Sequence, residues 1–324
     1  MKVLLTGATG FLGYHLTQKL VERGEDVRCL VRRREARIPA GAAAVHGDIR
    51  SPEALLEAAE DRDLVIHSAA LLGSRSSKKE YFAINAEGTR NMLEAAAKAG
   101  VKRFIHISTT GVLGCVNHDG TDESAPLLPS NDPYRDSKLN AEKAVRHSSY
   151  ADTANIIRPG WIYGPGERNA FPKILARLEA GKMFLISGGS NFIHPVYVFD
   201  VVDAVLACID RESTAGQTYH ITCGERVTMA EFLAAFARAA GVPEKIRTIP
   251  YSVGFVAAAA GSFLGRILGR RLLVNLHTLR LLTANSHFSV KKAKKELSFR
   301  PQTDCELGLR AFVEEYRQNS RRKG

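Results

Sequence analysis

Two features of this sequence carry residue types that could do chemistry together. The first is a tyrosine followed four positions later by a lysine, in the run Tyr134-Arg135-Asp136-Ser137-Lys138. Pro133 suits the first position of a helix, and residues four apart on a helix are neighbours on one face. We therefore expect the Lys138 ammonium to favour the phenolate and to lower the pKa of Tyr134. Such a phenol can give a proton to a substrate oxygen or take one from it.

The second feature is a glycine-rich turn near the amino terminus. Gly7, Gly10 and Gly13 are spaced three apart, between a short apolar run and an amphipathic pattern. Glycines at this spacing allow a tight turn and a close approach of the backbone to a pyrophosphate, which then faces the N–H groups of a helix start. The turn predicts a dinucleotide site, and together with Tyr134 it indicates hydride transfer. The residues expected to contact the cofactor here are Gly7, Thr9, Gly10, Phe11, Leu12 and Gly13.

The end of the second predicted strand bears on which dinucleotide binds. NAD sites usually have an acidic residue here for the ribose hydroxyls, but this chain has Val31, followed at once by Arg32. The donors of a guanidinium group match the oxygens of a 2′-phosphate. We therefore predict NADP as the preferred cofactor. NAD stays the alternative, in which Arg32 is only a solvated loop residue.

Three further candidates are predicted from their positions. Asp48 and Ile49 follow the third predicted strand, where the carboxylate could accept from the adenine amino group and the isoleucine could pack on the ring. Thr109 follows the strand ending at Ser108, and its hydroxyl could bind the reacting oxygen, although Ser or Thr at a strand end is often a cap. Asn85 lies on the preceding helix and is expected to position the cofactor or a backbone carbonyl.

Short apolar runs alternate with helical patterns over the first half of the chain, as in a parallel sheet with crossover helices. Most of the runs are apolar on both faces, which predicts a sheet covered on both sides. We predict an α/β fold, a Rossmann-type doubly wound parallel sheet with a smaller, mostly helical C-terminal substrate domain. Residues 1–163, with 196–221 returning, would form the dinucleotide-binding domain, and residues 164–195 and 222–324 the substrate-binding cap. The predicted strands are Lys2–Leu5, Val27–Val31, Ala43–His46, Leu64–His67, Arg103–Ser108 and Asn155–Arg158, and the predicted helices are Phe11–Arg23, Pro52–Ala59, Glu80–Ala99 and Pro133–Ser148.

Charge and cysteine content disfavour several classes of protein. The net charge of +11 fits a surface that attracts polyphosphate cofactors, and no basic stripe interleaved with aromatics indicates a nucleic-acid partner. The cysteines are five in number, irregularly spaced and without a C-x-x-C motif, which argues against disulfides and a metal site and for a reducing compartment. No stretch reaches the roughly 18 apolar residues that span a bilayer. We expect a cytoplasmic protein that acts on a small molecule.

With these motifs the chain resembles the extended short-chain dehydrogenases/reductases of the epimerase/dehydratase superfamily. The resemblance covers almost the whole chain. It implies that Tyr134, Lys138 and Thr109 carry catalysis, with Tyr134 and Lys138 also contacting the cofactor. It leaves a homodimer open, since two-helix dimers are common among such proteins. The other cofactor contacts that it implies are Ser68, Ala69 and Ala70 along the dinucleotide, and Pro159 and Ile162 at the nicotinamide end.

Two substrate motifs of the sugar-nucleotide members are missing. Those members hold a diphosphate with an arginine just before a Phe-Ile-His run, where this chain has Asn191, and with an Arg-x-Gly-Asp that the segment 280–287 lacks. A diphosphate without guanidinium partners would lose its strongest bonds. The chain therefore resembles most the 3β-hydroxysteroid dehydrogenase and dihydroflavonol reductase branch, which acts on the carbonyl or secondary alcohol of fairly apolar molecules. A nucleotide-sugar epimerase or dehydratase stays the alternative. A binding module with a regulatory dinucleotide is disfavoured by the intact catalytic residues.

Two apolar stretches in the C-terminal part have three open interpretations. Val253–Leu268 and Leu272–Leu282 could line a pocket for an apolar substrate. They could instead contact a membrane surface, since Arg266, Arg270 and Arg271 interrupt them. They could also be ordinary core of the smaller domain.

Overall fold

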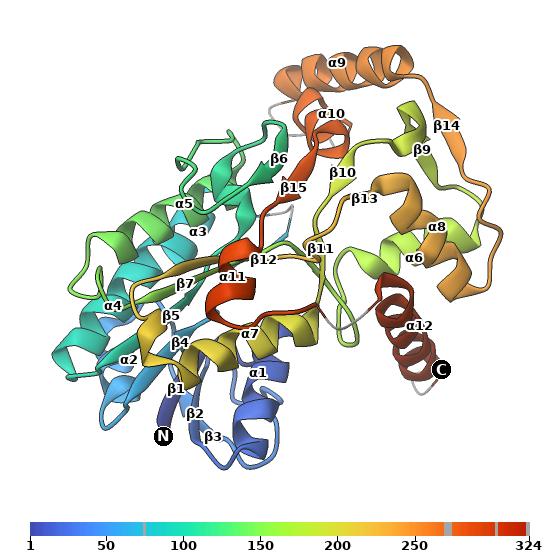
Figure 1. Cartoon of the computed structure of the whole chain (residues 1–324). Helices are drawn as coiled ribbons and strands as arrows, with labels where there is room; N and C mark the ends of the chain where they lie inside the picture. The colour runs from blue at the N-terminus through green and yellow to red at the C-terminus, as the bar shows by residue number, and fades with distance from the viewer. Residues whose placement is uncertain (74–75, 269–273, 302–303, 322–324) are drawn as a thin grey trace.

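A seven-stranded parallel sheet lies at the centre of the chain (Figure 1). The computed structural model describes residues 1–73, 76–268, 274–301 and 304–321. The strand order is β3-β2-β1-β4-β5-β7-β12. From β1 the chain first adds strands on one side and then, from β4 on, on the other side. Doubly wound sheets bind ligands at this switch point, beyond the carboxyl ends of the strands. The predicted doubly wound α/β fold is confirmed. The strands are β1 (Lys2–Thr6), β2 (Asp26–Val31), β3 (Ala43–His46), β4 (Leu64–His67), β5 (Arg103–Ile107), β7 (Asn155–Pro159) and β12 (Thr218–Ile221).

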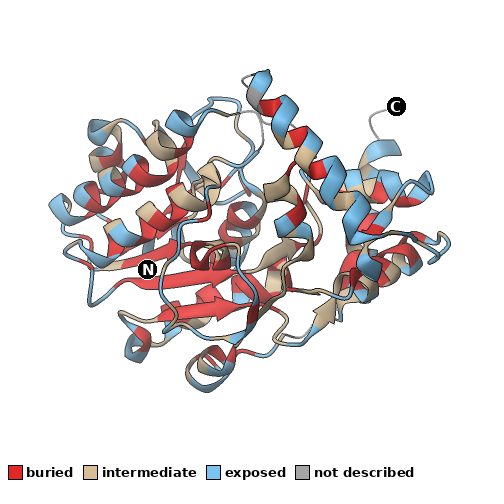
Figure 2. Cartoon of the chain, turned by 90° about the horizontal axis from the view of Figure 1, so that it is seen from above, coloured by how far each residue is buried: buried red, intermediate tan, exposed pale blue. Residues whose placement is uncertain are grey.

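Helices cover both faces of the sheet because both faces are apolar. Val3 and Leu5 of β1 belong to the core beneath α1 (Phe11–Glu22) and α7 (Val198–Asp210). Leu4 points to the other face, which carries the helices α2 (Pro52–Ala59), α4 (Gly88–Lys98) and α5 (Pro133–Arg146). All three β1 side chains are fully buried, and Figure 2 shows the strands as a buried layer. Each such side chain stabilises the fold by roughly 1.5–3 kcal/mol relative to an exposed one.

The predicted strands are all present, each within one residue of its expected bounds. The helix predicted over Glu80–Ala99 is present as a continuous helical run, but it contains a π turn that was not predicted. The structure divides it into α3 (Lys78–Tyr81), a wider π turn η1 (Phe82–Glu87) and α4. A capping box between Ser77 and Glu80 starts α3 two residues earlier than expected. Apolar periodicity does not reveal the extra residue of a π turn, which occurs frequently at functional sites.

A smaller group of elements follows β7 and packs around its own aromatic core. Phe171, Phe232, Phe236 and Phe312 are fully buried there. Thr228 and Glu231 form a capping box at the start of α8. The helices of this part are α6 (Phe171–Glu179), α8 (Met229–Ala240), α9 (Tyr251–Ile267), α10 (Leu276–Thr283) and α12 (Cys305–Arg321), and its paired strands are β8 (Trp161–Tyr163) with β11 (Pro195–Tyr197), β9 (Phe184–Ile186) with β14 (Arg247–Ile249), and β10 (Phe192–Ile193) with β13 (Val227–Thr228).

Segments far apart in the sequence join the two groups. The helix α7 and strand β12 bring residues 198–221 back to the main sheet, and α11 (Lys291–Glu296) packs beside β12. The long loop after β5 contains η2 (Thr110–Leu113) and β6 (His118–Thr121), which pairs with β15 (Ser286–Phe288) near the C-terminal end. The short 3-10 turns η3 (Ser187–Gly189) and η4 (Glu212–Thr214) complete the elements. The domain bounds drawn from the sequence stay a prediction.

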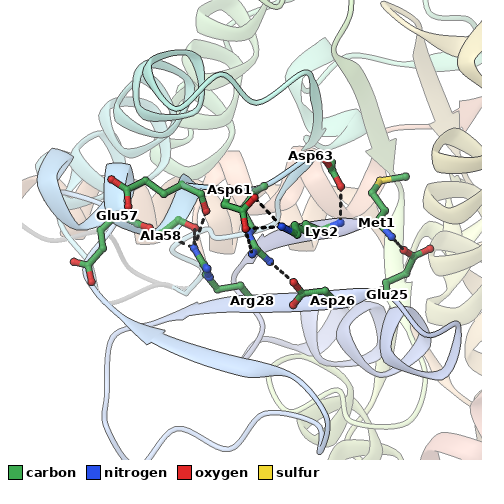
Figure 3. Close-up of polar contacts among 11 residues, drawn as sticks. Met1, Lys2, Glu25, Asp26, Arg28, Glu57, Ala58, Asp61 and Asp63 are labelled. Carbon is green, nitrogen blue, oxygen red and sulfur yellow. Dashed lines mark hydrogen bonds and ion pairs between the residues drawn. The ribbon is translucent and has the colours of Figure 1, made fainter.

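Polar contacts fix the amino-terminal edge of the sheet, opposite the strand ends that carry the site (Figure 3). The Lys2 backbone N–H donates to the Asp63 carboxylate at 2.7 Å, and the Lys2 ammonium pairs with Asp61 at 2.6 Å. The terminal ammonium of Met1 pairs with Glu25 at 2.6 Å. Exposed pairs of this kind contribute at most about 1 kcal/mol each, so they help the β1 register more than the stability.

No helix within the described ranges is both long enough and apolar enough to cross a membrane.

Candidate active site

A cavity of about 1410 Å³ runs along the carboxyl ends of the parallel strands. Its walls come from the loops that follow β1, β2, β3, β4, β5 and β7, together with one face of α5. The far end is closed by residues of the C-terminal part, including Met229, Leu281 and Phe288. Ligands of doubly wound sheets bind at this edge, so the cavity is the candidate site.

The glycine turn forms one wall of the cavity and leaves no room for side chains. Gly7 has a φ of +82°, and a Cβ there would lie 2.7 Å from the Ala69 backbone nitrogen. A Cβ on Gly13 would lie 2.1 Å from the Gly7 carbonyl oxygen. The helix α1 starts at Gly10 without a side-chain cap and without an acidic residue in its first turn. Its first N–H groups and positive dipole end therefore suit an anion, and the turn fits a dinucleotide pyrophosphate. All six predicted turn residues line the cavity: Gly7, Thr9, Gly10, Phe11, Leu12 and Gly13.

Basic side chains lie where the cavity passes the ends of β2 and β3. Arg32 lines it as predicted, and Arg33 and Arg37 lie beside it. Asp48 also lines the cavity, but its carboxylate is paired with Arg50, with Oδ1 2.8 Å from Nε and Oδ2 2.7 Å from Nη2. The Arg50 hydrogen bond lowers the pKa of Asp48 to about 2. The carboxylate is therefore an acceptor only.

Asn85 lies behind the cavity wall instead of in it. Ser68, Ala69 and Ala70 line the cavity as expected, but Asn85 does not. Its Oδ1 accepts from the Leu71 N–H at 2.6 Å, and its Nδ2 donates to Ser137 Oγ at 2.9 Å. Its Nδ2 also donates to the Leu71 carbonyl oxygen at 3.3 Å, so of the two roles expected for Asn85 the contact with a backbone carbonyl is present. The amide fixes the loop after β4 to α5.

Lys138 is buried at the carboxyl end of β5. Its side chain lines the cavity, and its ammonium donates to the Ile107 carbonyl oxygen at 2.6 Å. The His106 Nε2 atom lies 3.5 Å from the same ammonium. Burial lowers the pKa of Lys138 to about 8. The residue is only 2% exposed, so its charge is held by the backbone carbonyl and not by water.

Tyr134 lies one helical turn before Lys138 and also lines the cavity. Its ring packs against Tyr81, with ring centroids 6.3 Å apart. Burial raises the pKa of Tyr134 to about 12, although the nearby Arg135 lowers it in part. The predicted lowering of this pKa by Lys138 is wrong, because loss of hydration around the phenol dominates and the ammonium is directed at Ile107.

The candidate Thr109 and its neighbour Ser108, which both follow β5, have different surroundings. Ser108 is buried and donates to Glu142 at 2.7 Å, and Glu142 also pairs with the buried Arg158 at 2.6 Å. Thr109 lines the cavity, and its Oγ1 accepts from the Gly111 N–H at 3.1 Å. Thr109 is therefore both a cap of η2 and a cavity residue. Its hydroxyl proton has no acceptor among the described residues, so it is available for a substrate oxygen.

One part of the cavity wall is apolar with one polar corner. Pro159 and Ile162, which the resemblance implies for the nicotinamide end, also line the cavity. Most of the wall is hydrophobic, and its apolar residues are Val116, Trp161, Ile193, Met229, Leu281, Leu282 and Phe288.

Sequence reasoning missed the polar corner, which Arg135, His118 and His194 form. The Arg135 guanidinium lies 2.8 Å from the Cys115 sulfur. Its side chain forms no ion pair within 4.0 Å among the described residues, although its charge lowers the pKa of the nearby Asp132. His118 Nε2 and His194 Nδ1 are buried without hydrogen-bond partners among the described residues. Burial lowers the pKa of His118, and it lowers that of His194 to about 3, so both rings are neutral at neutral pH. The position of Arg135, directly after Tyr134, was the available signal.

The sequence model of the NAD dependent epimerase/dehydratase family matches residues 3–223. The chain belongs to this family. It is an NAD(P)-dependent enzyme of the extended short-chain dehydrogenase/reductase type, as the resemblance implied.

Individual relatives in this family point to the reductase branch. A 2-alkyl-3-oxoalkanoate reductase from Stenotrophomonas maltophilia is 29% identical, with 96% of this chain and 98% of the relative covered. A 3-beta-hydroxysteroid dehydrogenase from Mycolicibacterium neoaurum is 31% identical, with 95% of this chain and 89% of the relative covered. Among solved structures, a protein named gox2253 is 27% identical with a TM-score of 0.85, and 99% of each chain is covered. The expected resemblance to the hydroxysteroid dehydrogenase branch is confirmed.

Proposed function

We propose that this chain is a ketone reductase, or the corresponding alcohol dehydrogenase, for a fairly apolar small molecule. The observation that carries the proposal is one continuous cavity that joins the glycine turn to Tyr134 and then to a mainly apolar end. A dinucleotide held at the turn would extend along the strand ends towards Tyr134. The substrate would occupy the apolar end, with its carbonyl between Tyr134 and Thr109.

The roles of the chain's own residues follow from their protonation states. The bound nicotinamide supplies or accepts the hydride. Tyr134 gives its phenolic proton to the carbonyl oxygen in the reductive direction, and its raised pKa keeps that proton in place at neutral pH. Thr109 donates its free hydroxyl proton to the same oxygen and so orients the carbonyl. Lys138, one helical turn from Tyr134, would add a positive charge to the same wall of the cavity, with its ammonium held at the Ile107 carbonyl oxygen.

We assign NADP as the preferred cofactor. Arg32 lines the cavity directly after β2, and Arg33 and Arg37 provide further positive charge at this end. A 2′-phosphate there would gain charge-assisted hydrogen bonds that a 2′-hydroxyl lacks. No acidic residue stands at the end of β2 to favour NAD.

The polar corner supports a substrate with an acidic group near the ketone. Arg135 is a cation inside the cavity wall without an ion-pair partner among the described residues, and buried neutral donors or acceptors lie nearby on His118 and His194. A carboxylate next to the ketone would satisfy Arg135, while alkyl chains would fill the apolar end. The name of the Stenotrophomonas relative describes a substrate of this kind, a 3-oxoacid with an alkyl branch.

A nucleotide-sugar epimerase or dehydratase is the second candidate, since the family includes both. The geometry at Asn191 disfavours it. Asn191 is absent from the cavity lining and donates to the Ala284 carbonyl oxygen at 3.4 Å. A sugar diphosphate would therefore find no guanidinium at that position.

A substrate panel tests the proposal. Branched 3-oxoacids, apolar ketones and aldehydes would be assayed with NADPH and NADH by the fall in nicotinamide absorbance, and UDP- and dTDP-sugars by chromatography of the products. We expect turnover of ketones, fastest with NADPH. Conversion of the sugar nucleotides alone would contradict the proposal and favour the second candidate.

A further inference from the structure

The helix α9 (Tyr251–Ile267) turns its small residues towards the protein and its large apolar residues away from it. Gly261 packs so closely on the chain before α10 that a Cβ there would lie 1.9 Å from the Val274 carbonyl oxygen. Gly254 faces the buried side chain of Leu279 in α10, and a Cβ at Gly254 would lie 3.5 Å from it. Ser262 accepts from the Leu276 N–H at 3.0 Å. In Figure 1 α9 lies across α10 at the outer edge of the C-terminal part.

The outward face of α9 is a broad apolar surface. Val256 is 67% exposed, Phe263 64% and Ile267 66%. A surface helix normally turns such residues inward, so ordinary core is the wrong interpretation for this stretch. Contiguous apolar surface of this kind marks an interaction site. The α9 face consists of Val253, Phe255, Val256, Phe263, Leu264 and Ile267, all exposed.

The positive charge of the segment around this face favours an anionic partner. The sequence contains no acidic residue between Glu244 and Glu296. Arg247 and Arg280, in the elements that flank α9, are both exposed. An apolar helix face in a cationic, acid-free segment suits anionic lipid headgroups above a hydrocarbon layer. A second copy of this chain would instead bring the same positive charges together, which is unfavourable. The basic residues of this stretch that stand within or next to the α9 sequence are Lys245, Arg247, Arg266, Arg270, Arg271 and Arg280, of which the structure describes the surroundings of Lys245, Arg247 and Arg280.

We propose that α9 docks the protein on the surface of an anionic membrane. The helix has 17 residues and is therefore about 25 Å long, at 1.5 Å per residue, so it would lie in the interface without spanning the bilayer. The Val256 and Phe263 side chains would enter the acyl layer. Arg247 and Arg280 would meet the headgroups.

The same docking would bring the cavity close to the lipid. The helix α10 lies between α9 and the cavity, because Leu279 packs against α9 while Leu281 and Leu282 line the cavity wall. Leu282 is also 42% exposed. Two other cavity residues, Leu72 and Val116, are exposed as well. A lipophilic substrate could thus pass from the membrane to the site. This route rests on the proposed function, but the docking of α9 does not.

Vesicle flotation of the full chain tests the docking without any substrate or cofactor. Wild type would be mixed with phosphatidylcholine vesicles or with vesicles containing equal parts of phosphatidylcholine and phosphatidylglycerol. We expect flotation with the anionic vesicles and less of it at high salt, which screens the headgroup attraction. The double variant Val256→Asp, Phe263→Asp should bind roughly tenfold more weakly or worse, because two apolar anchors are lost.

The matched control is Leu307→Asp, an equally exposed leucine on α12 that does not line the cavity. It should float like wild type. Since all three side chains are exposed, thermal melts should show that each variant folds. Equal flotation of the double variant and wild type would overturn the proposal. Wild type that binds neither kind of vesicle would also overturn the proposal. If light scattering then showed a wild-type dimer that the double variant dissociates, the partner of α9 would be a second copy of this chain. Because no turnover is measured, a failure of ketone reduction would leave this result unaffected.

Discussion

The ammonium group of Lys138 lies 2.6 Å from the backbone carbonyl oxygen of Ile107, the last residue of β5. This contact fixes the lysine at the point where the sheet ends and the cavity begins. It also removes the ammonium from water, because Lys138 is only 2% exposed. One carbonyl replaces part of the lost hydration, and the pKa of Lys138 falls from 10.5 to about 8.

Lys138 should therefore make stability depend on pH. Between pH 8 and 10.5 the unfolded chain binds more protons at this residue than the folded chain, so its contribution to the free energy of unfolding rises with pH. Below pH 8 the Lys138 ammonium is charged in both states, and the whole cost of burying it lowers the free energy of unfolding. Lys138→Met removes this dependence, and its stability relative to wild type should decline by roughly 3 kcal/mol between pH 7 and pH 10.5. Urea denaturation of both proteins across this range measures the difference, and a constant difference would show that Lys138 titrates normally.

Arg32 should set the choice of cofactor. Arg32→Asp removes a guanidinium partner of the 2′-phosphate and adds repulsion, so the Kd for NADPH should rise by roughly tenfold to a hundredfold, as for lost hydrogen bonds to charged groups. The Kd for NADH should change little. Fluorescence titration measures both constants. The control is Arg34→Asp, an exposed neighbour that does not line the cavity. Equal loss of NADPH affinity in both variants would mean that only the general positive field matters.

Gly7 should be required for its close backbone approach as well as for its conformation. Gly7→Ala places a Cβ 2.7 Å from the Ala69 nitrogen at a φ of +82°. Gly24 has a similar φ of +77° but nothing within 4 Å of its Cβ position, so Gly24→Ala carries the strain without the clash. We expect Gly7→Ala to lower the melting temperature more than Gly24→Ala and to abolish dinucleotide binding in titrations. Similar effects of the two variants would remove the case for a close approach.

Arg135 should discriminate between acidic and neutral substrates. Arg135→Gln keeps length and polarity but loses the charge, so the KM for a branched 3-oxoacid should rise roughly tenfold or more, the range for a hydrogen bond to a charged group. The KM for the methyl ester of the same acid should stay near the wild-type value. Steady-state kinetics with the acid and its ester measures how much the substrate carboxylate contributes to the KM. A parallel rise for acid and ester would assign Arg135 to the fold of the cavity wall.

Much of the dinucleotide half could be predicted from the sequence, because its signals are local. Strands that are apolar on both faces indicate a covered parallel sheet, and the glycine spacing indicates the turn between β1 and α1. The predicted strand bounds hold to within one residue.

Features that depend on contacts between distant segments could not be predicted. Asn85 bonds to Leu71 and Ser137, and nothing in its neighbourhood in the sequence indicates either partner. The pKa of Tyr134 depends on how deeply the folded cavity buries the phenol, and the sequence shows only the spacing to Lys138. The outward face of α9 was equally hidden, since an apolar stretch fits core, pocket and membrane contact alike.

The central claim is that Tyr134 exchanges the proton with the substrate oxygen. The most direct measurement is kcat for ketone reduction by Tyr134→Phe beside Tyr81→Phe, the neighbouring ring 6.3 Å away, with the Kd for NADPH measured for both. We expect Tyr134→Phe to lower kcat by roughly 10²- to 10⁴-fold, because a general acid is lost, with an unchanged Kd. Tyr81→Phe should stay close to wild type. Near-normal turnover by Tyr134→Phe with NADPH bound would show that another group supplies the proton.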